Sequence, residues 1–149
     1  MSRVEIAVSV RAGASAERVF AVLTDWPRHR EWMVLTSAEV REGDGRSVGS
    51  RIAAFSGVGP AGFLDTMTIT RWEPPHLVEV AHTGRLVRGS GAFRIEDTGP
   101  GRSVITWWES LDLPFGPVGR VGWLPVRPLS EALLRLSLQR LARLAARPG

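Results

Sequence analysis

The sequence contains no cysteine, no lysine and no tyrosine. Without cysteine the chain can form no disulfide, carry out no thiol catalysis and bind no metal through thiolates. Its three histidines also leave little material for a metal centre. We therefore expect the protein to use neither a metal ion nor a cofactor.

The absence of lysine and tyrosine also inflates the isoelectric point, which is near 11.3. All nineteen basic residues are arginine, so nothing titrates between histidine and arginine. The actual net charge is only +4. The arginines are spread along the chain apart from a cluster in its last quarter, which is a weak electrostatic footprint. We expect no nucleic-acid partner.

Long apolar runs are absent as well. No stretch of about 18 apolar residues is present to span a bilayer, and the first residues alternate in polarity where a signal peptide would be continuously apolar. We therefore expect a cytoplasmic protein with no stable membrane insertion. A chain of 149 residues that is 44% hydrophobic fits a single domain over residues 1–149.

The order of apolar, polar and turn residues along the chain predicts a strand, two short helices and six further strands. Val4, Ile6, Val8 and Val10 alternate with polar or small residues, as in a strand with one buried face. A helix capped by Ser15 follows, and a second short helix comes after it. Turn residues then separate six apolar stretches at hairpin spacing, which favours an antiparallel sheet. The stretches are residues 36–42, 50–55, 63–72, 76–83, 86–97 and 103–113.

A Pro/Gly-rich connection over residues 114–128 precedes a leucine-rich terminal segment. Its leucines cover half the circumference of a helix, so we predict one amphipathic helix from about Leu129 to Ala145. The helix should cover the sheet, with Leu133, Leu136 and Leu141 in contact with it. A basic helix lying on a membrane surface is the alternative.

This order of elements, together with SAERVFAVLTDWPRHREWM at 15–33 and TRWEPPH at 70–76, resembles the SRPBCC superfamily. The resemblance is to its polyketide cyclase/dehydrase and lipid-transport group and covers essentially the whole chain. It implies an α+β helix-grip fold, in which a curved seven-stranded antiparallel sheet wraps around the long C-terminal helix. It also implies an apolar cavity between sheet and helix, but no particular reaction.

The segment AHTGRLVRGSG at 81–91 has the glycine spacing of a phosphate-binding loop. It lacks that loop's lysine, and a strand follows where a helix is needed, so we reject this interpretation. A two-residue turn at Thr83-Gly84 or Gly84-Arg85 places one set of residues on the cavity face. Glycines in that set either leave room for a ligand or bend the strand. The set is Val78, Val80, His82, Val87, Gly89, Gly91, Phe93 and Ile95.

The same alternation turns Asp65 and Glu109 inward and favours Trp107 over Trp108 on the inner face. A hairpin with Glu73-Pro74 as its loop places Asp65 directly opposite His82. Three ionisable groups in a cavity could perform acid/base chemistry, with His82 transferring protons, Asp65 orienting it and Glu109 as a second acid. The alternative is a polar anchor or contact with water at the cavity mouth.

Two classes of function follow. The first is binding or transfer of a hydrophobic small molecule, such as a lipid, polyketide or aromatic intermediate. The second is a polyketide cyclase or dehydratase that uses the inward acid/base residues, and a module that docks on a membrane or a protein ranks below both. The identity of the ligand and the oligomeric state stay open. The expected ligand-binding residues are Trp32, Phe55, Phe63, Met67, Val80, Phe93, Trp107, Leu133, Leu136 and Arg140.

Overall fold

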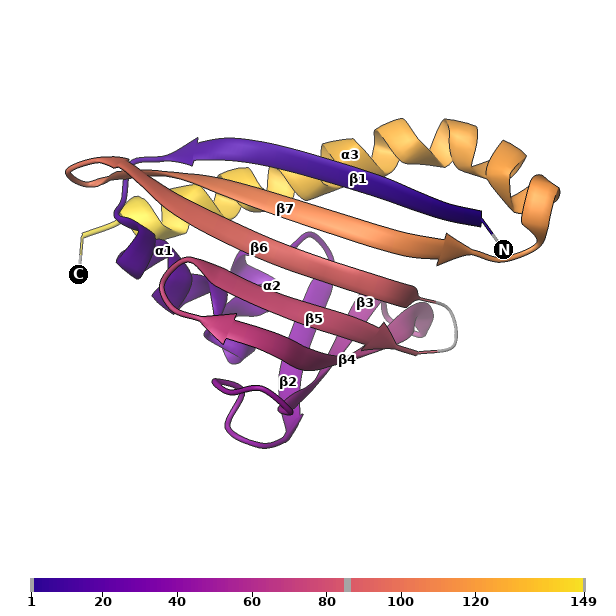
Figure 1. Cartoon of the computed structure of the whole chain (residues 1–149), viewed down its shortest axis with the longest axis horizontal. Helices are drawn as coiled ribbons and strands as arrows, with labels where there is room; N and C mark the ends of the chain where they lie inside the picture. Colours follow the sequence, from indigo (N-terminus) through magenta and orange to yellow (C-terminus); the bar gives the residue numbers. More distant parts are fainter. Residues whose placement is uncertain (1, 85–86, 149) are drawn as a thin grey trace.

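A computed structural model describes residues 2–84 and 87–148 of the chain. Its elements follow the predicted order of strand, two short helices, six strands and a long helix (Figure 1). A single turn of 3-10 helix leads into the second short helix. The elements are β1 (Ser2–Ala12), α1 (Ala16–Leu23), η1 (Trp26–Arg28), α2 (His29–Trp32), β2 (Thr36–Glu42), β3 (Arg51–Val58), β4 (Ala61–Glu73), β5 (Leu77–Thr83), β6 (Arg88–Gly99), β7 (Arg102–Leu113) and α3 (Gly116–Ala146).

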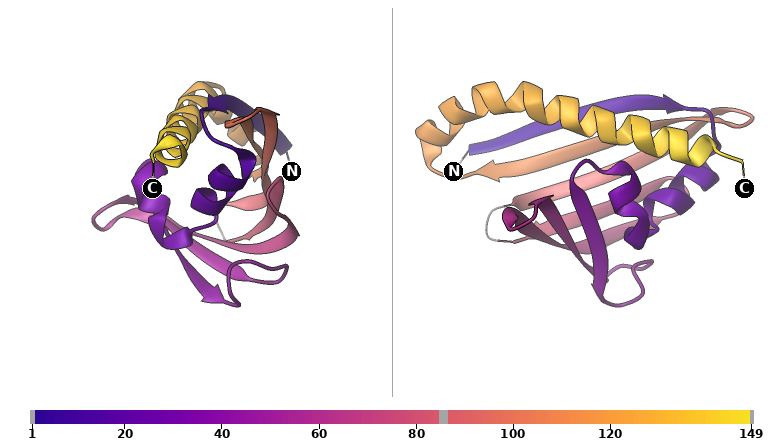
Figure 2. Two further views of the ribbon diagram at one scale, coloured as in Figure 1. Left: turned by 90° about the vertical axis from the view of Figure 1, so that its left-hand side faces the viewer. Right: turned by 180° about the vertical axis from the view of Figure 1, so that it is seen from behind.

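The seven strands form one antiparallel sheet in the order β1-β7-β6-β5-β4-β3-β2. Strands β2 to β7 are therefore a meander, and β1 joins its far edge beside β7. Figure 2 shows that the sheet curves strongly and that α3 runs along β1, with α1 and α2 beside its C-terminal half. The α+β class and the wrapped seven-stranded sheet are confirmed.

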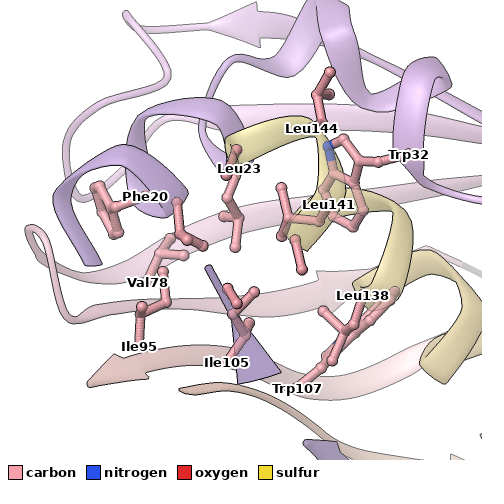
Figure 3. Close-up of a cluster of buried hydrophobic side chains, with 14 of the residues drawn as sticks. Phe20, Leu23, Trp32, Val78, Ile95, Ile105, Trp107, Leu138, Leu141 and Leu144 are labelled. Carbon is pink, nitrogen blue, oxygen red and sulfur yellow. The ribbon is translucent and has the colours of Figure 1, made fainter. Parts of the chain in front are cut away.

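The core lies where the C-terminal half of α3 and the short helices meet the sheet (Figure 3). Leu138 and Leu141 of α3 are fully buried against Leu23 of α1, Trp32 of α2 and Ile105 of β7. Such burial is the main favourable term in folding, so this end of α3 is firmly held.

Helix α1 begins as predicted, since the Ser15 hydroxyl accepts a hydrogen bond from the Arg18 amide and caps it. Helix α3, by contrast, begins at Gly116 and not near Leu129. The predicted connection is helical because Pro117 lies in the first turn, where no amide donor is needed. Pro125 and Pro128 have a φ that suits a helix, although each removes one hydrogen bond.

The predicted packing of α3 is right for Leu141 and wrong for two other leucines. Leu133 and Leu136 are 42% and 38% exposed. Each lies about 100° round the helix from a neighbour that faces inward, Leu134 or Ser137. The leucine arc is therefore split into a buried sector and a partly exposed one.

The predicted pairing of β4 with β5 has the correct faces but the wrong register. His82 lies opposite Met67, and Val80 lies opposite Ile69. The loop contains Pro74 to His76, and an extra residue, Thr70, forms an irregularity in β4, so the pairing moves by two residues. A shift of two keeps the side chains up to Ile69 on their predicted side, because side chains alternate with a period of two, whereas beyond Thr70 the shift is three.

The turn between β5 and β6 is also longer than predicted, since Thr83 pairs with Arg88. Of the predicted turn positions, Arg85 lies outside the described residues. The pairs of Val80 with Gly91 and of His82 with Gly89 confirm the predicted cavity-facing set on these strands. In the part of the chain that the structure covers, none of the helices combines the length and apolarity needed to cross a bilayer.

Candidate functional site

Three ionisable side chains meet on the concave face of the sheet. The His82 Nδ1 atom lies 3.0 Å from Oδ1 of Asp65, and its Nε2 atom lies 2.8 Å from Oε2 of Glu109. The side chains are 5%, 15% and 13% exposed for His82, Asp65 and Glu109. The structure thus brings together the three residues predicted to lie inside. Asp65 reaches His82 diagonally and not from the directly opposed position.

The two carboxylates fix the protonation of the imidazole. Burial by itself lowers the pKa of His82, but the hydrogen bonds to Asp65 and Glu109 and the charges of both carboxylates outweigh it. Together they raise the pKa of His82 to about 10. At neutral pH, His82 is therefore an imidazolium that donates one N–H to each carboxylate. The cluster carries a net charge of −1 when both carboxylates are ionised.

Glycine 91 makes the contact between Glu109 and His82 possible. Strand β6 lies between β5 and β7, so the Glu109 side chain must cross it to reach His82. A Cβ atom on Gly91 would lie 2.5 to 2.8 Å from the Glu109 carboxyl atoms. Gly91 leaves room on the concave face, but the Glu109 side chain fills that room, where the prediction had a ligand.

The geometry limits what the cluster can do chemically. Both nitrogens of His82 are engaged, and Trp107 Nε1 donates a further hydrogen bond of 3.0 Å to Oε1 of Glu109. Because the two carboxylates bind opposite sides of the ring, the three side chains do not converge on one point. Among the described residues, no group of three or more His, Asp or Glu side chains is placed to hold a metal ion.

A separate cleft of about 370 Å³ opens between α2, the start of β2, β3 and the C-terminal part of α3. Phe55 and Arg140, both predicted to bind ligand, line it. Its walls combine apolar side chains with two arginines and two hydroxyl groups. The lining residues are Arg30, Met33, Leu35, Thr36, Ser37, Phe55, Gly57 and Arg140.

The other predicted lining residues are distributed differently. Trp32, Phe93 and Trp107 pack on one another with ring centroids 4.7 to 6.3 Å apart and fill the interior. Val80 is buried and Met67 packs on the core, while Phe63 is 41% exposed on β4. Leu133 and Leu136 lie on the partly exposed sector of α3. The Trp107 side chain faces inward, as predicted.

Sequence reasoning missed Met33 and Leu35 in the cleft and the buried His29. Burial lowers the pKa of His29 to about 4, although its hydrogen bond to the Leu23 carbonyl oxygen acts in the opposite direction. The signal for His29 was its spacing of three residues from Trp26 and from Trp32, whose rings pack on it. The signal for the cleft was the apolar run from residue 32 to 35, which belongs mostly to neither a helix nor a strand.

Comparisons with solved structures show that the chain has the helix-grip fold. A Thermus thermophilus protein superposes with a TM-score of 0.78 at 16% identity, covering 95% of this chain and 97% of its own. A Mesorhizobium loti protein gives 0.74 at 14% identity, with 98% and 99% covered. A Chromobacterium violaceum protein gives 0.72 at 14% identity, with 97% and 99% covered. These likenesses show the fold.

The family is identified by sequence. Residues 3–146 match the model of the polyketide cyclase / dehydrase and lipid transport family, and the chain belongs to that family. The SRPBCC resemblance seen in the sequence is thereby confirmed. No curated protein matches the chain significantly. The family name covers both lipid transport and chemistry on polyketides, so the choice between them depends on the residues of this chain.

Proposed function

We propose that the protein binds a hydrophobic small molecule in the cleft between α2, β2, β3 and α3, as a binding or transfer protein. The observation that carries this proposal is the cleft of about 370 Å³ itself. Its volume lies in the range of about 300 to 1,000 Å³ that is typical of small-molecule sites. Membership of a family whose name includes lipid transport agrees with binding of a hydrophobic molecule.

The exposure of apolar side chains around the cleft supports this proposal. Leu35 is 62% exposed and Phe55 is 37% exposed. On the α3 side, Leu136 stands one helical turn before Arg140, which lines the cleft. Large apolar side chains that gather in the walls of a concave surface gain free energy when a ligand removes them from water.

A fluorescence titration with the uncharged dye N-phenyl-1-naphthylamine tests the proposal. We expect saturable binding to one site, weakened about tenfold or more by Phe55→Asp, since a charge in an apolar wall must be desolvated. The control is Val48→Asp, which changes a 64% exposed side chain in the loop between β2 and β3. Binding that is absent, or equal in the two variants, would contradict this function.

The cyclase or dehydratase hypothesis rests on Asp65, His82 and Glu109. An imidazolium with a pKa of about 10 is a poor proton acceptor at neutral pH, and both of its N–H groups are already bound by carboxylates. This arrangement favours the polar anchor over the acid/base role. The variant Asp65→Asn distinguishes the anchor role from the catalytic role. Only the catalytic role predicts that the variant loses turnover of a polyketide substrate while it still binds ligand.

A further inference from the structure

The outer face of α3 changes from apolar to cationic along its length. Five residues at helical spacing, all between 38% and 75% exposed, form its first part: Val118, Val121, Leu129, Leu133 and Leu136. The next positions on the same face are Arg140 and Arg143, and Arg147 follows directly after the last residue of the helix. All three arginines are exposed.

These arginines line a second hollow that adjoins the apolar cleft. Its volume is about 200 Å³, and Glu31, Arg140, Arg143, Leu144 and Arg147 line it. Arg140 belongs to both hollows, so it marks the boundary between them. Arg30 is the second arginine that lines the apolar cleft. The apolar cleft and the hollow lined by arginines are therefore contiguous.

In the part of the chain that the structure describes, the arginines at this place lack ion-pair partners. Glu31, the acidic residue of the second hollow, is already paired with Arg28 at 2.9 Å. The hydrogen bond from Arg28 is the main reason why the pKa of Glu31 is lowered, and the charges of Arg147 and Arg30 lower it further. Within residues 2–84 and 87–148, no carboxylate forms an ion pair with any of the four arginines at 30, 140, 143 and 147.

We propose that this group of arginines binds the anionic head of an amphiphile whose apolar tail lies in the adjoining cleft. Guanidinium groups bind phosphate and carboxylate oxygens through paired N–H donors, which suits a phosphate or carboxylate head. Arg140, at the boundary, is placed to contact the head while Phe55 and Leu35 contact the tail. This inference rests on the proposed function and specifies the chemical class of the ligand.

Calorimetric titrations with decyl phosphate and decanol, which share one tail, test the headgroup. We expect decyl phosphate to bind at least about tenfold more tightly, because charge-assisted hydrogen bonds form only with the phosphate. The double variant Arg140→Gln/Arg143→Gln should remove most of this difference. The matched control is Arg88→Gln/Arg94→Gln, which removes two exposed arginines from β6.

The possible outcomes separate this inference from the function on which it rests. Equal affinity for decanol and decyl phosphate in the unchanged protein would overturn the headgroup site and leave the apolar cleft supported. Absence of binding to both compounds would overturn the proposed function. Equal losses in the two double variants would show a general charge effect and also overturn the site.

Two further arms identify the source of the anion. Inorganic phosphate that binds as tightly as decyl phosphate would overturn the amphiphile and indicate a site for a free anion. Vesicles of phosphatidylcholine with phosphatidylglycerol test the bilayer as the source. Binding to these vesicles that depends on Arg140 and Arg143, without binding of monomeric decyl phosphate, would overturn the small-molecule site in favour of membrane docking. The inference predicts the reverse result in both arms.

Discussion

Two charged regions of the molecule differ in burial and in pairing: the carboxylates on the concave face of the sheet and the arginines at the C-terminal end of α3. Asp65 and Glu109 are largely buried and share one imidazolium between them. Arg140, Arg143 and Arg147 are exposed beside a hollow whose acidic residue is paired elsewhere. Opposite charges that pair inside a protein hold a fixed geometry, whereas arginines without an ion-pair partner at a cleft are free to bind a ligand.

The difference shows why buried ionisable residues need not mark an active site. The His82 cluster has the perturbed pKa that is characteristic of catalytic groups. Structural networks perturb pKa values as well, and here every nitrogen of the ring already has a partner. The proposed ligand site therefore lies in the open region, and the closed region links β4, β5 and β7 through the hydrogen bonds of His82.

The largest expected effect compares two leucines of α3, one in the buried core and one on the outer face of the helix. Leu141→Ala should lower the free energy of unfolding by about 2 to 5 kcal/mol, as for other fully buried leucines. Leu133→Ala should lower it by about 1 kcal/mol or less, since the side chain is already 42% exposed. Urea denaturation measures both. Similar losses in the two variants would show that the outer face of α3 is also buried.

A smaller effect is expected where Glu109 crosses β6. Gly91→Ala should lower the free energy of unfolding by about 1 to 3 kcal/mol, because the new methyl group overlaps the Glu109 carboxylate. Gly99→Ala on the same strand is the control, since the nearest atom to its new Cβ would be 4.0 Å away. If Gly91→Ala proves as stable as the control, the contact between Glu109 and His82 is not formed.

A further expected effect is a pH dependence caused by His82. Its pKa of about 10 in the folded protein exceeds the ordinary value of 6.5, so its stabilisation is complete below pH 6.5. That stabilisation is lost as the pH rises from 6.5 through 10. Few other groups titrate over this range, because the chain has no lysine, tyrosine or cysteine. Urea denaturation at several pH values should therefore show a falling stability.

Asp65→Asn should weaken this fall, because the variant removes one of the two charges that hold the proton on His82. Glu96→Gln removes an exposed carboxylate from β6 and should leave the pH dependence as it is. A pH dependence that is the same in both variants would contradict the assigned cluster.

The sequence was sufficient to predict the sheet, the facing of its strands and the three inward ionisable residues. Alternation of apolar and polar residues determines a strand's faces even when the register is wrong by two, as it is for Asp65 and His82. The cleft could not be predicted in this way. Met33 and Leu35 lie outside regular strands and helices, and no periodicity indicates the direction of their side chains.

The start of α3 was missed for a related physical reason. Residues 116 to 128 contain three prolines and three glycines that argue against a helix, yet this segment is helical. Its outer face also carries the exposed apolar residues that lead to the arginines. Because helix propensity argued against a helix here, the sequence did not predict the surface that we connect with ligand binding.

The most direct test of this account is an NMR titration of the protein with decyl phosphate, recording the backbone amides and the His82 ring nitrogens together. We predict that the amides of Leu35, Phe55 and Arg140 shift with saturation, while the two ring nitrogens of His82 keep their signals and stay protonated. Saturable shifts of the His82 ring without shifts at Leu35 and Phe55 would contradict it, because they would place the ligand at the buried cluster.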